Sequence, residues 1–393
     1  MAFIIITNVS EYILGYRCFV QSQIFLASKI LEYYEDGHGS SQSKVISKGE
    51  VHMNMWFRSM SVLGILGLIL SGCSGKSSQI PQTGGTKQEA KVLNLATSVN
   101  SQHSLHEGLV KFKEMVEQES NHSIQVKIFH SGQMGGDREL AEALQIGTVQ
   151  AAIISPSALG NFVPAFTAYD LPFLFADEQQ VDRFLHGPVG MEILNSGEAR
   201  GYAGLSYMEL GFRNLTNNKH EIKSVKDLLD IKVRVAENPL TVDTWKALGA
   251  KPTPMAFTEL FTALQQGTVD AQENPYGQIA ATKFYEVQKY LTKTNHTYSP
   301  APLMASKKFM DSLSKADQQI IRKAAETAAE QQVKINRERE TAALQLLKDN
   351  GMKITELSPQ ELDGFRKAVQ SINEKYADKI GKDLLPKIMD AVK

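Results

Sequence analysis

The chain has 393 residues, with 42 Lys and Arg against 43 Asp and Glu, and a formal net charge of −1 at pH 7. This balance, with no basic stripe, argues against nucleic acid as a partner. Only two cysteines occur, Cys18 and Cys73. The long remainder after Cys73 therefore has no thiol for catalysis, disulfides or zinc, and its roughly 320 residues suffice for two domains.

An apolar run without charge, Met60–Leu70, leads through Ser71-Gly72 to Cys73. A stretch of about a dozen apolar residues is too short for a transmembrane helix but fits the core of a signal peptide. Small residues before a cysteine resemble a bacterial lipobox, in which cleavage precedes the cysteine and its sulfur receives a lipid. The alternative is a buried hydrophobic helix that ends in cysteine, but a polar Gly/Ser/Pro/Gln segment follows.

We therefore expect a lipoprotein signal peptide over residues 53–72, a lipid on Cys73 and a linker over residues 73–90. The mature protein is expected on the extracytoplasmic face of the cell membrane, tethered by that lipid. Because no later stretch approaches the length of a membrane span, the lipid is the expected anchor.

Residues 1–52 precede the expected signal peptide, although signal peptides begin at the N-terminus. Lys48-Gly49-Glu50-Val51 can be encoded by AAA-GGG-GAG-GTG, a purine-rich ribosome-binding sequence shortly before Met53 and Met55. We hypothesise that translation starts at one of these methionines and that residues 1–52 are an upstream extension of the gene prediction. The alternative is a genuine N-terminal region, which a peptide from residues 1–52 in the unprocessed precursor would establish.

Strands and helices alternate from Lys91 onward. Hydrophobic periodicity predicts strands at Val92–Ala96, Ile124–Ile128 and Ala151–Ile154, with helices at Leu105–Glu119 and Glu139–Ile146. Alternation of this kind predicts an α/β domain with a mostly parallel sheet.

A second set of elements follows. Strands are predicted near Tyr202–Tyr207, Lys232–Val235 and Asp270–Ala271, and helices at Pro239–Leu248 and Thr258–Gln265. Ser314 begins a capping box that opens a long amphipathic helix to about Lys348, and Ser358 opens another helix.

The sequence contains no metalloprotease, nucleophile-elbow, Walker or dinucleotide motif. We therefore expect neither enzymatic activity nor a cofactor. His103 and His106 lie three residues apart near a predicted helix start, but no third ligand lies nearby, so no metal site is expected. The glycine-rich segment Gly132–Gly136 lacks the spacing of a phosphate cradle and is expected to be a loop.

Two arginines and a polar turn stand near predicted strand ends. Apolar residues of Ile231–Val235 share one strand face, which leaves Arg234 on the other. Arg213 and the turn Gln272–Pro275 have comparable positions, and ligands of open α/β sheets bind at the carboxyl ends of strands. Taken alone, an arginine in such a position is most often a solvated strand residue, and spacing does not join these residues into a site.

Five motifs in one order carry a family resemblance: Gly211–Asn217, Lys232–Val235, Pro254–Leu264, Val269–Pro275 and Lys283–Leu291. From Lys91 to the C-terminus the chain resembles the DctP-type solute-binding proteins of TRAP transporters. The resemblance implies a two-lobed periplasmic-binding-protein-like α/β fold with a ligand cleft between the lobes and long C-terminal helices. It also implies a small organic acid as ligand, and delivery of that acid to a permease of small and large membrane subunits driven by an ion gradient.

The resemblance implies lobe boundaries as well. Lobe I is expected to contain residues 91–210 and about 300–339, and lobe II residues 211–299 and about 340–393.

The resemblance also assigns site residues. Arg234 matches the arginine that pairs with the ligand carboxylate, a role for which the planar guanidinium fork is suited. Arg213 matches a second cleft arginine, Asn274 an amide on the other side of the carboxylate, and Phe257 an aromatic residue over the ligand. In the first lobe, the loops that contain Thr97 and Ser155 match cleft segments.

Glu237 and Asn238 follow Arg234 closely. A carboxylate beside the anchoring arginine accepts hydrogen bonds from hydroxyls and repels a second ligand carboxylate. We therefore expect a hydroxylated monocarboxylate, such as a hexuronate or related sugar acid, over a C4-dicarboxylate. The alternative is that Glu237 faces solvent or neutralises Lys232. Two other functions stay open on sequence alone, an extracytoplasmic enzyme acting on sugar acids and a chemosensor subunit with the same cleft.

Overall fold

The computed structural model describes residues 90–393. The expected upstream extension (1–52), the expected signal peptide (53–72), Cys73 and the linker up to residue 89 lie outside the described residues. Within the described part of the chain, no helix is both long enough and apolar enough to cross a membrane.

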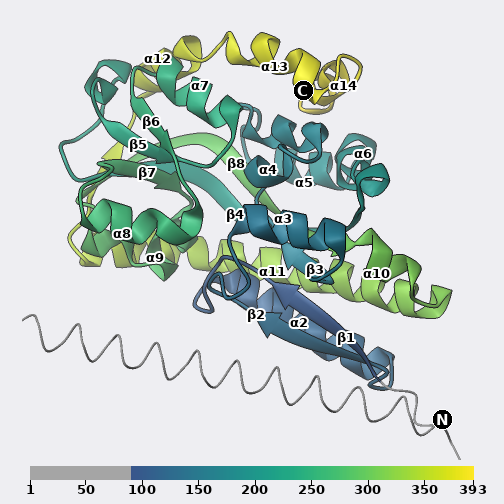
Figure 1. Cartoon of the computed structure of the whole chain (residues 1–393). Coiled ribbons are helices and arrows are strands. Elements are labelled where there is room, and N and C mark those ends of the chain that lie inside the picture. Colours follow the sequence, from purple (N-terminus) through teal and green to yellow (C-terminus); the bar gives the residue numbers. More distant parts are fainter. Residues whose placement is uncertain (1–89) are drawn as a thin grey trace, which may run out of the picture. The chain divides into compact units, whose positions relative to one another are not determined.

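One nine-stranded sheet organises residues 90–393 (Figure 1). Its order is β2-β1-β3-β8-β4-β7-β5-β6, and β9 pairs with β8 outside this path. The strands are β1 (Lys91–Ala96), β2 (Ile124–Phe129), β3 (Ala151–Ile153), β4 (Tyr202–Asn217), β5 (Lys232–Val235), β6 (Lys251–Pro254), β7 (Ala271–Asn274), β8 (Tyr290–Ser306) and β9 (Lys353–Glu356).

The two ends of the sheet are parallel and define two lobes. In lobe I, β1 pairs in parallel with β2 and β3; in lobe II, β5 pairs in parallel with β6 and β7. Between them run the long strands β4 and β8, which are antiparallel to each other. The predicted two-lobed α/β fold is confirmed, but parallel pairing is concentrated at the ends of the sheet, and the long antiparallel strands connect one lobe to the other.

The long strands differ most from the sequence prediction. β4 extends to Asn217, well beyond the predicted strand. β8 was not predicted because Pro300 and Pro302 disrupt the strand pattern of the sequence, although the strand itself is continuous. Lobe I pairing with β8 ends at Leu303, opposite Ile153 of β3, so both prolines lie beyond the last paired residue of β3. Their missing N–H groups therefore remove no hydrogen bond of that ladder.

Helices cover both faces of the sheet. The α-helices are α2 (Ser104–Glu119), α3 (Asp137–Ile146), α4 (Pro156–Leu159), α5 (Glu178–Leu185), α6 (Pro188–Asn195), α7 (Pro239–Ala247), α8 (Leu260–Gln265), α9 (Tyr276–Ala281), α10 (Lys307–Asp311), α11 (Lys315–Asp349), α12 (Pro359–Ala368), α13 (Ile372–Ile380) and α14 (Leu384–Ala391). Short 3-10 turns include η1 (Pro164–Asp170), η3 (Val225–Leu228) and η4 (Phe257–Glu259). Ser314 caps α11 through its side chain, so the predicted long helix is confirmed.

Buried apolar residues form three clusters. One extends along one face of the sheet, from α3 through η1 to α7 and α13. A second packs α2 and the first half of α11 against β1 and β2, and the third packs α8 and α9 against the end of α11. The long helix α11 thus contributes to the cores of both lobes, and Figure 1 shows it on the opposite side of the sheet from α12–α14.

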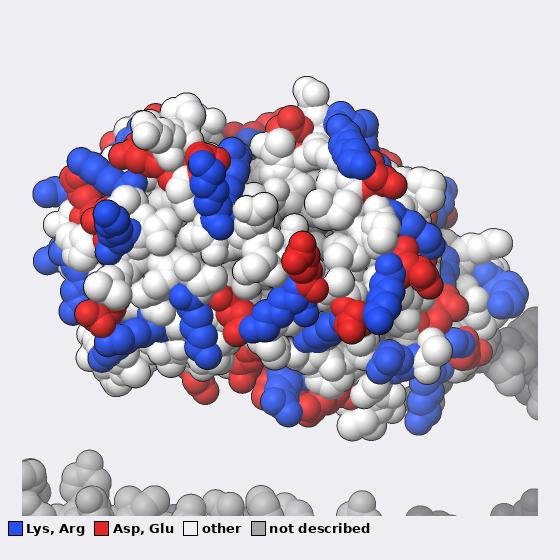
Figure 2. Space-filling model, turned by 90° about the horizontal axis from the view of Figure 1, so that it is seen from above, with Lys and Arg blue, Asp and Glu red and all other residues white. Residues whose placement is uncertain are grey.

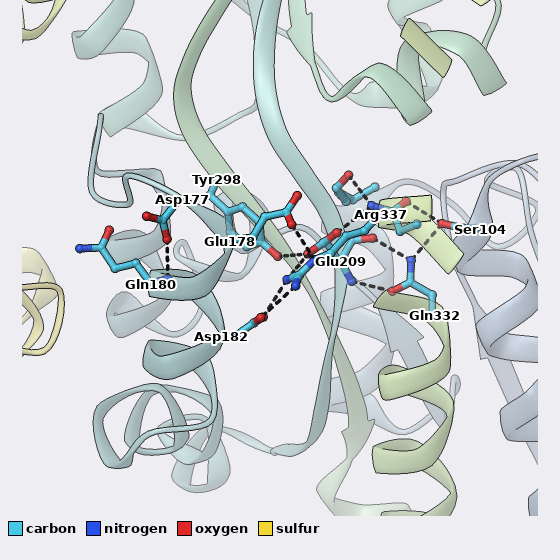
Figure 3. Close-up of polar contacts among 11 residues, drawn as sticks. Ser104, Asp177, Glu178, Gln180, Asp182, Glu209, Tyr298, Gln332 and Arg337 are labelled. Atoms are coloured by element: carbon cyan, nitrogen blue, oxygen red, sulfur yellow. Dashed lines mark hydrogen bonds and ion pairs between the residues drawn. The ribbon is translucent and has the colours of Figure 1, made fainter. Parts of the chain in front are cut away.

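An ionic cluster around a buried carboxylate fixes α11 to the crossing strands (Figure 3). Arg337 of α11 donates to Oε2 of Glu209 in β4 at 2.8 and 2.9 Å and forms two bonds to Asp182 of α5 at 2.7 and 2.8 Å. The hydroxyl of Tyr298 in β8 donates to the same Glu209 oxygen at 2.8 Å. These donors compensate a carboxylate that is almost fully buried.

The C-terminal helices contact elements from both ends of the sheet. The Tyr376 hydroxyl in α13 donates to Asp243 of α7 at 2.6 Å, and Lys387 of α14 donates to both carboxylate oxygens of Glu192 in α6 at 3.0 Å. The expected boundaries place α6 in lobe I and α14 in lobe II, so the last helix bridges them. The residue ranges of the lobes stay a prediction.

Candidate functional site

A cavity of about 260 Å³ lies between the lobes. Its walls come from the carboxyl ends of β1, β3, β5, β6 and β7 and from the neighbouring part of β4, which is where ligands bind in open α/β sheets. Six of the eight predicted ligand-binding residues line it: Ser155, Arg213, Arg234, Glu237, Phe257 and Asn274. Sequence spacing alone did not join these residues, and the fold brings them together.

The side chain of Arg234 in β5 is fixed by a backbone carbonyl that follows β6. Its Nε and Nη2 donate to the Met255 carbonyl at 3.0 and 2.7 Å, and its side chain is almost fully buried. Within the described residues, Nη1 has no acceptor. Burial lowers the pKa of Arg234 to about 10, so the guanidinium stays charged at neutral pH. A fixed, desolvated cation with a remaining N–H group is suited to bind a carboxylate.

Arg213 of β4 is positioned by a buried carboxylate that the sequence did not single out. Glu273 accepts from Arg213 Nε at 2.5 Å and from Nη2 at 3.0 Å, and Nε2 of His296 lies 3.2 Å from Glu273 Oε2. Burial alone would raise the pKa of Glu273, but the charge and hydrogen bonds of Arg213 and His296 lower it to about 2. Glu273 therefore stays ionised and fixes the Arg213 plane.

The predicted amide and aromatic residues contact these arginines. Asn274 Oδ1 accepts from Arg213 Nη2 at 3.0 Å, and its Nδ2 donates to Gln272 Oε1 at 2.6 Å. The Phe257 ring lies under the Arg234 guanidinium, with 6.0 Å from Cζ to the ring centroid. Both side chains therefore restrict where an anion can approach the two guanidinium groups.

Lobe I contributes a carboxylate that was missed, Asp137 at the first position of α3. Its Oδ1 accepts from the Ser98 hydroxyl at 2.6 Å, and its Oδ2 accepts from the Ser155 backbone N–H at 2.9 Å. Asp137 thereby joins two cleft loops and lines the cavity with both serines. The signal was available, because Asp137 follows the glycine-rich loop and opens a helix.

Two predicted residues lie outside the cavity lining. The Thr97 hydroxyl accepts from the Val99 N–H at 3.2 Å, and its neighbour Ser98 reaches the cavity instead because successive side chains point to opposite sides. Asn238 is buried and caps α7, where its Oδ1 accepts from Leu240 N at 2.8 Å. Its Nδ2 donates to the Ser157 carbonyl at 2.9 Å and to Asp170 at 3.1 Å.

Glu237 lines the cavity and is exposed. Among residues 90–393 its carboxylate forms no hydrogen bond, and no ion pair joins it to Lys232. Its carboxylate oxygens are therefore available as acceptors at the mouth of the cavity. Asn161, Gln278 and Ser299 also line the cavity and were not predicted; no sequence pattern points to them.

The histidine pair has a structural role. His103 is the N-cap of α2, with Nδ1 accepting from Leu105 N at 3.1 Å, and His106 packs edge-on against His130 at 5.2 Å between ring centroids. Within residues 90–393, no group of three or more His, Cys, Asp or Glu side chains is arranged to hold a metal ion.

Charged side chains of both signs are mixed on one face of the molecule. On the face shown in Figure 2, basic and acidic side chains are interspersed, with neutral residues between them. The two cavity arginines, by contrast, are largely buried. On this face, therefore, no patch of one charge sign stands out, whereas two fixed cations line the cavity.

Many solved structures resemble the chain, and three of them carry a stated ligand that bears on the site. The sugar acid binding protein DctPAm from Advenella mimigardefordensis strain DPN7T, in complex with galactonate, is 38% identical, with 77% of this chain and 98% of that chain covered at a TM-score of 0.76. A TRAP periplasmic solute-binding protein from Polaromonas sp. JS666, bound to D-erythronate, is 38% identical, with 76% of this chain and 98% of that chain covered at a TM-score of 0.73. A TRAP periplasmic solute-binding protein from Shewanella oneidensis, with bound succinate, is 30% identical, with 77% of this chain and 100% of that chain covered at a TM-score of 0.74.

Residues 95–379 match the family described as bacterial extracellular solute-binding protein, family 7 (DctP). This match covers most of the described residues, including every lobe I and lobe II segment of the cavity. Members of the family bind substrates for transporters, so the chain is a binding protein and not an enzyme. The chain belongs to the DctP-type solute-binding proteins of TRAP transporters.

Proposed function

We propose that this protein captures an organic acid outside the cytoplasm and delivers it to a TRAP permease of small and large membrane subunits. The observation that carries the proposal is the pair of fixed arginines, Arg213 and Arg234, each with Nη1 lacking an acceptor among the described residues. Both guanidinium groups border one cavity, so a single carboxylate can accept from both. Binding requires no covalent step.

We further propose a hydroxylated monocarboxylate, such as a hexuronate or related sugar acid, as the ligand. Beyond the arginines, the lining carries the carboxylates of Asp137, Glu142 and Glu237. Carboxylates accept hydrogen bonds from hydroxyls, whereas a second ligand carboxylate beside them is repelled. The relatives bound to galactonate and erythronate are also closer in sequence than the relative bound to succinate.

A C4-dicarboxylate is the second candidate. Arg138 lines the cavity as well, is well exposed and pairs with Glu142 at 3.3 Å. Its guanidinium is a cation that a second ligand carboxylate can reach if Arg138 leaves Glu142. The relative with bound succinate supports this candidate.

Ligand screening separates the two candidates. Purified residues 90–393 are heated with galactonate, galacturonate, erythronate, succinate or malate, and the unfolding midpoint is followed; a ligand that binds the native state raises it. We expect stabilisation by a sugar acid, with the affinity then measured by calorimetry. Stabilisation by succinate or malate and by none of the sugar acids would establish the dicarboxylate instead.

We also propose that a lipid on Cys73 tethers the protein to the extracytoplasmic face of the cell membrane. The proposal rests on the lipobox-like sequence Leu70–Cys73 and the polar linker behind it. In cells that express the full chain, Cys73→Ser is expected to move the protein from the membrane fraction to the soluble fraction. Membrane retention of the variant would contradict the tether. Permease genes beside this one would favour transport over a chemosensor role.

A further inference from the structure

We propose that Asn100 and Asn161 are positioning residues that hold the two lobes closed around the ligand. The inference rests on the proposed function, because it concerns how tightly the cavity retains its acid. Each asparagine donates its side-chain N–H from lobe I to a backbone carbonyl of lobe II. Asn100 Nδ2 lies 2.9 Å from the Ala281 oxygen, and Asn161 Nδ2 lies 2.7 Å from the Glu237 oxygen.

Asn100 is prepared for this contact by its own loop. It follows β1, and its Oδ1 accepts from the Gln102 backbone N–H at 3.0 Å, which orients Nδ2 toward α9. Ala281 is the last residue of α9, and carbonyls at a helix C-terminus lack donors within the helix. Asn100 thus supplies a donor where lobe II has an available acceptor.

The surroundings of this contact are closely packed. His103, at the start of α2, lies against Gly277 of α9, where an added Cβ would stand 3.5 Å from His103 Nε2. Asn100 does not line the cavity. Its effect on ligand binding must therefore act through the arrangement of the lobes and not through contact with the ligand.

Asn161 makes the corresponding contact from a different loop. It follows α4, and its acceptor, the Glu237 carbonyl, belongs to the turn between β5 and α7. That turn begins directly after the strand that carries Arg234. The bond therefore ties the segment that anchors the ligand carboxylate to lobe I.

Contacts that cross the cleft exist only when the lobes are together. They shift the equilibrium between open and closed arrangements by their own free energy. Ligand leaves a two-lobed binding protein by opening, so loss of such a contact is expected to accelerate dissociation more than it slows association.

Two substitutions of Asn100 isolate the donor. Asn100→Asp keeps an acceptor for Gln102 N but adds a negative charge; Asn100→Ala adds no charge but loses the Gln102 bond. The two variants share only the loss of the donor to Ala281. Asn195 serves as a matched control, because its Nδ2 donates to the Met191 carbonyl at 2.9 Å within a single helix, away from the cleft.

The test uses residues 90–393 and the tightest-binding acid of the panel, with association and dissociation rates measured by stopped flow. We expect both Asn100 variants to dissociate about five- to tenfold faster, which corresponds to one lost hydrogen bond. The association rate of Asn100→Ala and the unfolding midpoints without ligand should stay at the wild-type values. Asn161→Ala should also dissociate faster, but Asn161 lines the cavity, so the Asn100 variants carry the test. Asn195→Asp and Asn195→Ala should bind as wild type.

The outcomes separate three situations. Unchanged dissociation rates in both Asn100 variants would overturn the proposal. Faster dissociation in Asn100→Asp but not in Asn100→Ala would assign the effect to the added charge and would also overturn the proposal. If the wild-type protein binds no acid of the panel, the proposed ligand class fails instead, independently of any asparagine variant.

Discussion

At the scale of single residues, the site depends on how an arginine is held as much as on its charge. Arg234 donates from Nε and Nη2 to the Met255 carbonyl, and these bonds fix the plane of the guanidinium before a ligand binds. Such preorganisation reduces the entropy lost on binding. The same holds for Arg213, whose plane is fixed by the buried carboxylate of Glu273.

This arrangement predicts that charge alone does not restore binding. Arg234→Lys keeps a cation but loses the planar fork and the bond pattern to Met255, and we expect an affinity for the acid about 30-fold weaker, or about 2 kcal/mol. Arg234→Ala should weaken it further. Calorimetry measures both, with the exposed Arg183→Lys as a control for the conservative change. Wild-type affinity in Arg234→Lys would remove the fork from the explanation.

At the scale of elements, the start of α2 contains a pH-sensitive cap. Nδ1 of His103 accepts from Leu105 N, so the ring must remain unprotonated at that nitrogen for the cap to exist. Burial, with a smaller contribution from Arg339, lowers the pKa of His103 from 6.5 to about 4. The native state therefore resists protonation where the unfolded state accepts it.

The sign of the effect follows from this lowered pKa. The stability contributed by the neutral ring is complete above pH 6.5 and is lost as the pH falls from 6.5 toward about 4. By pH 5 the loss amounts to about 2 kcal/mol. His103→Asn keeps an acceptor at the cap without a titrating group, so its unfolding free energy should fall less than wild type between pH 7.5 and pH 5. Urea unfolding at the two pH values measures this difference; parallel losses would contradict it.

At the scale of the whole described unit, the two lobes are not independent. β4 and β8 cross from one to the other, α11 packs in both cores, and the Arg337 cluster joins the helix to the strands. We expect residues 90–393 to unfold in one cooperative transition. Trp245, the only tryptophan of this range, is buried in α7 and reports on lobe II by fluorescence, whereas circular dichroism reports on every helix. Separate midpoints for the two signals would show that the lobes unfold separately.

The sequence predicted elements with strong local signals. The capping residue Ser314 and a sustained helical period predicted α11 almost to its last residue. β8 had no comparable signal, because two prolines interrupt it and its partners lie far away in the chain. Its stability comes from pairing on both sides, which is tertiary information that a local pattern does not contain.

The candidate site shows the same division. Arg213, Arg234 and Asn274 could be named from a family resemblance, and the fold places all three at one cavity. Glu273, which fixes Arg213, lies inside the motif Val269–Pro275, but its burial gives it this role. The roles of Asn100 and Asn161 could not be predicted from the sequence, because their acceptors are backbone carbonyls, which every residue type has.

The position of β8 has a consequence for how the chain folds. In lobe I, β3 pairs with β8, so Ala151 cannot form its ladder contact before Ala305 has been synthesised. The apolar faces of β1 and β2 are likewise buried only once α11 has been made. Neither lobe is a continuous piece of chain, and neither can be finished until most of the residues have been synthesised. Contacts between such distant residues slow folding. Within residues 90–393, neither lobe is therefore complete early in synthesis, and slow folding of this kind is compatible with export of an unfolded chain.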